Sequence, residues 1–103
     1  MGDDVIHVAF EGVLDRSKRE AFVAALPTEP LHEKVVIDLS EVKSIHLTVL
    51  TELARYRRKF ITSGRSAHDL LLVAGSEVRK QLQAAGLANA FTVLPSERTG
   101  TNG

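Results

Sequence analysis

The sequence contains no cysteine, so it can form neither a disulfide framework nor a thiolate metal site. Its 13 basic and 13 acidic residues cancel, and its only aromatic residues are one tyrosine and four phenylalanines. Such a chain has no overall field that draws it to nucleic acid, and few rings on which bases could stack. We therefore expect no nucleic-acid partner.

Long apolar runs are also absent, since none approaches the roughly 18 residues of a membrane-spanning helix. The acidic start, residues 1–4, lacks the basic and apolar regions of a signal peptide. We expect a soluble, globular, cytoplasmic protein without direct membrane insertion. The domain is assigned to residues 1–95, and residues 96–103, which have nothing to bury, are expected to form a disordered tail.

Apolar periodicity and helix-boundary residues predict alternating strands and helices. A capping-box pattern starts the first helix near Ser17, and Ser76 is expected to cap the last. The order implies an α/β fold, a mixed, mostly parallel β-sheet with helices packed against it. The expected strands are 5–14, 35–39, 70–74 and 91–94, and the expected helices begin near 17, 48 and 77. Strand 35–39 is apolar on both faces apart from Asp38, as a central strand should be.

Residues suited to catalysis or metal binding do not gather in the sequence. None of the histidines has another ligand at helical spacing, and no glycine-rich phosphate loop is present; the histidines are His7, His32, His46 and His68. Asp38 either pairs with the carboxylate of Glu41 or braces a turn, the commoner use of Asp at a strand end. We expect no enzyme activity, no metal and no cofactor.

The densest charge run is basic and comprises Arg55, Arg57, Arg58 and Lys59. A solvated helix face is its default interpretation. From the residues alone, the chain is a small α/β binding module.

Three segments together resemble the STAS domain family, which includes anti-sigma factor antagonists and the cytoplasmic domains of sulfate transporters. They are residues 10–15, the strand end 35–40, and the stretch 77–87 with the following Phe91 and Val93. The resemblance covers about residues 5–95. It implies a STAS-like single domain that works as a non-enzymatic protein-interaction module, bound to an anti-sigma factor that is a serine-kinase-like protein.

The family's switch lies at the strand–helix junction, which typically reads Asp-Ser-Ser-Gly-Leu in the antagonists. The partner kinase phosphorylates the first serine, and the added negative charge breaks the contact. The corresponding residues here are His46, Leu47, Thr48, Val49 and Leu50, so the usual phosphorylated hydroxyl is absent.

The resemblance implies a partner-binding surface at the junction and the turn beside it, formed by Asp15, Arg16, Ser44, His46, Leu47 and Thr48. Thr48 is a possible phosphorylation site. Leu47 either inserts as an apolar anchor into a partner or turns inward and packs. His46 is either a helix-start residue or a pH-sensitive contact.

A second interpretation concerns the short form of the domain. A strand that longer antagonists have before residue 5, and a helix that they have after residue 93, are not evident in this sequence. This form is similar to the small STAS subunit that binds the ATPase of an ABC-type phospholipid transport complex. A threonine at the junction contacts the ATPase there, and the resemblance implies the same role for Thr48.

Overall fold

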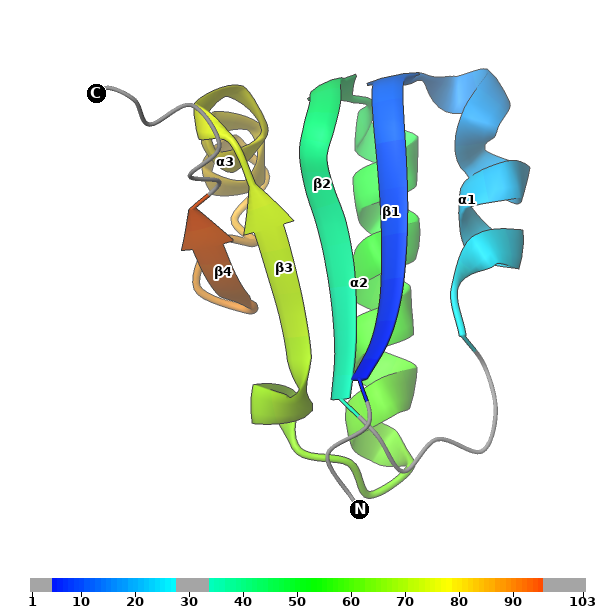
Figure 1. The fold of residues 1–103 in the computed structure, drawn as a ribbon, viewed down its shortest axis with the longest axis vertical. Coiled ribbons are helices and arrows are strands. Elements are labelled where there is room, and N and C mark those ends of the chain that lie inside the picture. The colour runs from blue at the N-terminus through cyan, green and yellow to red at the C-terminus, as the bar shows by residue number, and fades with distance from the viewer. Residues whose placement is uncertain (1–4, 28–33, 96–103) are drawn as a thin grey trace.

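Four parallel strands form one sheet in the computed structural model, which describes residues 5–27 and 34–95 (Figure 1). The strands are β1 (Val5–Leu14), β2 (Lys34–Ile45), β3 (Leu70–Ala74) and β4 (Thr92–Pro95). The α-helices of the described residues are α1 (Arg19–Ala25), α2 (Leu47–Thr62) and α3 (Ser76–Ala84). Single 3-10 turns, η1 (Arg16–Lys18) and η2 (Ala67–Asp69), precede α1 and β3.

The strand order is β1-β2-β3-β4, and every neighbouring pair is parallel. Each strand is connected to the next by a helix that returns the chain to the same end of the sheet, which is why all strands run in one direction. The α/β fold is thus confirmed, and all the described strands are parallel, where a mixed, mostly parallel sheet was expected.

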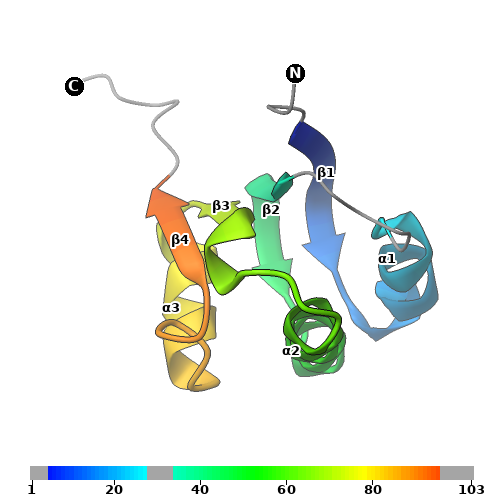
Figure 2. The same cartoon turned by 90° about the horizontal axis from the view of Figure 1, so that it is seen from below.

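Helices α2 and α3 lie on the same face of the sheet, and α1 lies beside β1 (Figure 2). The side chains of β2 that face the helices are fully buried: Val35, Ile37 and Leu39. Val36 and Asp38, on the other face, are only half-buried. The expectation that this strand is buried on both faces is therefore wrong, because the helices cover one face only.

The predicted bounds of β1 and β3 are confirmed, whereas β2 continues six residues beyond the predicted Leu39, to Ile45. Helix α1 begins at Arg19 instead of Ser17, because Asp15 first caps the 3-10 turn η1. Gly75, not Ser76, is the N-cap of α3. The predicted tail 96–103 and His32 lie outside the described residues.

No helix of the described residues is long and apolar enough to cross a membrane.

The core is a single cluster, and both the sheet and the helices contribute residues that are fully shielded from solvent. These include Phe22, Ile37, Leu39, Leu53, Leu70, Leu72 and Leu82.

Candidate functional site

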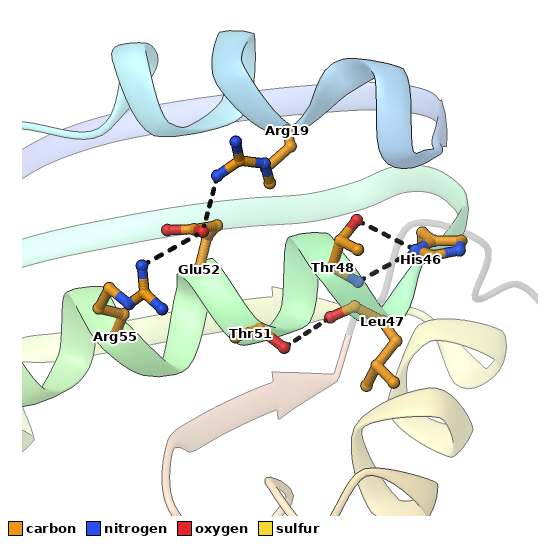
Figure 3. Close-up of polar contacts among 7 residues, drawn as sticks. All are labelled: Arg19, His46, Leu47, Thr48, Thr51, Glu52 and Arg55. Carbon is orange, nitrogen blue, oxygen red and sulfur yellow. Dashed lines mark hydrogen bonds and ion pairs between the residues drawn. The ribbon is translucent and has the colours of Figure 1, made fainter.

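His46 is the single residue between β2 and α2, at the carboxyl end of the sheet (Figure 3). Its backbone is still extended, with φ −75° and ψ 152°, and its N–H donates to the carbonyl of Leu14 at 2.8 Å. The preceding N–H, that of Ile45, donates to Oε1 of Gln81 on α3 at 2.8 Å. Contacts from β1 and α3 therefore fix the backbone of the junction from two sides.

The imidazole of His46 caps α2. Its Nδ1 accepts the backbone N–H of Thr48 at 3.0 Å, and the Thr48 hydroxyl lies 3.0 Å from the same nitrogen (Figure 3). The carbonyl of His46 accepts from the N–H groups of Val49 and Leu50. Since Nδ1 acts as the acceptor, the ring proton of the neutral imidazole is on Nε2. His46 therefore does here what Ser, Thr or Asp usually does at a helix start.

Leu47, the first residue of α2, points away from the core and is 63% exposed. It is the most exposed of the large apolar side chains in the described residues. Its carbonyl accepts the hydroxyl of Thr51 at 3.0 Å, one turn along the helix (Figure 3). Of the two interpretations of Leu47, the inward one is wrong, because buried Val49 and Leu50 take the core positions instead.

The remaining site residues expected from the sequence lie at the same end of the sheet. Asp15 follows β1 directly, and its Oδ1 accepts both the N–H of Ser17 at 3.0 Å and its hydroxyl at 2.6 Å. The hydroxyl contact is the main cause that lowers the pKa of Asp15 below its usual value. Arg16 is exposed, and Ser44, the penultimate residue of β2, is half-buried opposite Val13 of β1.

Two residues that the sequence did not single out hold this surface together. Gln81 supports Ile45, as described, and Glu52 links two helices. Its Oε2 lies 3.0 Å from Nη1 of Arg19 on α1 and 3.6 Å from Nη1 of Arg55 on α2 (Figure 3). The Glu52 side chain is only 11% exposed. The only sequence signal is that Glu52 is the sole acid in α2 and lies three residues before Arg55, at ion-pair spacing.

The basic run lies along α2 beyond Leu47 and Thr51, beside a shallow groove. The groove is lined by Thr51, Ala54, Arg55, Arg57, Arg58, Ile61 and Thr62. Arg55 pairs with Glu52, and the guanidinium of Arg57 lies 5.8 Å from the ring centroid of Phe91. The simple picture of a solvated face is thus incomplete, since two of these cations also make contacts within the protein.

Asp38 lies inside β2 and not at its end. The prediction that it braces a turn after the strand is therefore wrong. Its Oδ1 accepts the N–H of Ser40 at 2.9 Å, and its Oδ2 lies 3.5 Å from Nε2 of His7. Within residues 5–27 and 34–95, no three His, Cys, Asp or Glu side chains are grouped so that they could hold a metal ion.

No protein-family model matches the sequence, and a search of curated proteins returns no match. The geometry therefore carries the functional argument. It defines a surface of one exposed apolar side chain on a fixed helix start, flanked by exposed polar groups.

Proposed function

We propose that the β2–α2 junction is a protein-docking site, and that the chain acts in the cytoplasm as an antagonist of a serine-kinase-like anti-sigma factor, without catalysis of its own. The observation that carries the proposal is Leu47, an apolar side chain held 63% exposed at a helix start.

The cost of docking supports this choice of surface. A partner gains most when it buries an apolar side chain whose backbone is already ordered, since little conformational entropy is then lost. The backbone at Leu47 is fixed through Ile45, His46 and Thr48. Leu47 is thus suited to be the central anchor, with Thr51 and the Asp15 turn in the polar rim.

Regulation by phosphate differs from the family's pattern under this proposal. Leu47 has no hydroxyl, so modification at that position is excluded. Thr48 has one, but it is half-buried and lies against Nδ1 of His46. A kinase that modifies Thr48 has to break this contact first, so Thr48 is a hindered phosphorylation site. We propose that docking is not switched by phosphorylation at Leu47.

The test is a titration with two purified proteins encoded in the same genome, a serine-kinase-like anti-sigma factor and the ATPase of an ABC-type phospholipid transporter. Leu47→Ala should raise the dissociation constant of the anti-sigma factor complex about tenfold or more, as expected for an interface anchor. Leu94→Ala is the matched control, because Leu94 is also exposed, at 42%, but lies on β4.

The outcomes separate the two partners. Binding of the anti-sigma factor that is weakened by Leu47→Ala and not by Leu94→Ala supports the proposal. If only the ATPase binds, with the same dependence on Leu47, the docking site stands and the function is that of the transporter subunit. If neither complex depends on Leu47, the junction is not the docking site.

A further inference from the structure

Among the described residues, the edge of the sheet at β1 is long and unpaired. Strand β1 has 10 residues, and β2 is its only neighbour among the described strands. The N–H and C=O groups that point away from β2 along such an edge are a template for a further strand. The opposite edge, β4, has four residues and ends in Pro95, which has no N–H to donate.

Most of the features that usually protect an edge strand are missing from β1. It contains no lysine and no proline, and Glu11 is its only acid. Both register irregularities in the β1–β2 ladder place the extra residue in β2, so they do not interrupt β1. Gly12, whose φ is +76°, is the third residue from the end of β1.

Helix α1 does not replace a neighbouring strand. Figure 2 shows α1 beside β1 but displaced toward the layer of α2. Its contact with β1 is made from the helix side of the sheet, where the rings of Phe22 and Phe10 lie 4.7 Å apart. A strand added next to β1 would therefore lie in the layer of the sheet, and α1 would pack against it from the helix side, as the other helices pack against the strands of this fold.

We propose that two copies of this chain pair antiparallel through β1 and form one continuous eight-stranded sheet, with the two-fold axis at Ala9. Residues at equal distances on either side of Ala9 then face each other on the same side of the sheet. His7 faces Glu11 of the second copy, and Val5 faces Val13 of the second copy.

The sequence of β1 matches itself in this arrangement. Each imidazole of His7 meets a carboxylate, and this pair occurs twice because of the symmetry. Val5 and Val13, which are 51% and 47% exposed in the single copy, cover each other. Moving the axis by one residue to Val8 places His7 opposite Ala9 and Val5 opposite Glu11, so both matches are lost. This self-complementarity favours a second copy over an unrelated strand.

The first experiment is light scattering coupled to gel filtration over a range of concentrations. The wild-type chain, 11.2 kDa as a monomer, should approach twice that mass as its concentration rises. Ala9→Lys places two ammonium groups directly opposite each other, so we expect the dimer dissociation constant to rise roughly tenfold or more. Leu94→Lys, which also introduces a lysine but on the other edge strand, should leave it unchanged.

Cysteine variants then test the register, since the natural chain has no cysteine. Under mild oxidation Ala9→Cys should form a disulfide between copies, because opposed residues are about 4.5–5.5 Å apart between Cα atoms. Val5→Cys alone should not, because its counterpart in the second copy is about 26 Å away along the strand. The double variant Val5→Cys with Val13→Cys should cross-link again.

A wild-type chain that stays monomeric at every concentration would overturn the proposal. So would a dimer that Ala9→Lys leaves intact, or Val5→Cys that cross-links as fast as Ala9→Cys. A dimer that Leu94→Lys dissociates instead would place the interface at β4. None of these results bears on the β2–α2 junction, because Ala9→Lys should leave partner binding through Leu47 unchanged.

Discussion

Single residues at the carboxyl end of the sheet hold backbone groups with their side chains. Asp15 does so for η1, and His46 does so for α2. Each side chain accepts the N–H of the residue two positions further along the chain. In each case the residue that directly follows the cap is exposed: Arg16 after Asp15, and Leu47 after His46. The caps therefore order the surface without covering it.

The pKa of Asp15 gives a pH-dependent test at this scale. It lies below the usual value, mainly because the Ser17 hydroxyl donates to the carboxylate. A carboxyl group with a lower pKa in the folded than in the unfolded state stabilises the fold above its unfolded pKa. That contribution is lost as the pH falls through the folded pKa. NMR titration of the Asp15 carboxyl carbon should show a higher pKa in Ser17→Ala than in wild type. An unchanged pKa would show that the hydroxyl contact is not made in solution.

At the scale of elements, both regular alternation, in β1, and a short continuous apolar run, in β3, predicted strand bounds correctly. Strand β1 alternates without interruption from Val5 to Val13, and its bounds were predicted correctly. In β2 the buried residues after Ile37 are Leu39, Val42 and Ile45. The extra residues that β2 carries against β1 produce this spacing of three, which hides the two-residue period of a strand. That is why the second half of β2 was missed.

The candidate site also has a part that the sequence could predict and a part that it could not. The strand–helix boundary is visible in the local pattern, and the proposed role of Leu47 and Thr48 there rests on a family resemblance. The supports of the site are not local: Glu52 contacts Arg19 at a separation of 33 residues, and Gln81 contacts Ile45 at 36. A single sequence without the fold contains no signal that pairs residues so far apart.

The cap of α2 can be tested at the level of the element. His46→Ala removes the acceptor for the Thr48 N–H, and we expect the free energy of unfolding to fall by about 0.5–2 kcal/mol. His46→Asp supplies a carboxylate acceptor at the positive end of the helix dipole, so it should retain or increase stability. Urea denaturation of the three proteins measures this order. Equal stability of His46→Ala and wild type would contradict the assigned cap.

At the scale of the whole molecule, α2 connects the core to the proposed docking surface. Its buried stripe, with Val49, Leu53 and Phe60, packs against the sheet, while its first residue, Leu47, faces solvent. Two of the three leucines of this helix therefore lie in opposite environments: Leu53 is fully buried, and Leu47 faces solvent.

The same substitution at both leucines tests this division. Leu53 is fully buried, so Leu53→Ala leaves a cavity and should lower the free energy of unfolding by about 2–5 kcal/mol. Leu47→Ala removes a side chain that already contacts water, and the change should stay within about 0.5 kcal/mol. Urea denaturation gives both values, and the partner titration is repeated on Leu47→Ala at a temperature where it is fully folded. Weakened binding with unchanged stability assigns Leu47 to the interface. If Leu47→Ala instead destabilises the protein as much as Leu53→Ala, then Leu47 packs in the core, and the docking site has to be sought elsewhere, first at Asp15 and Arg16.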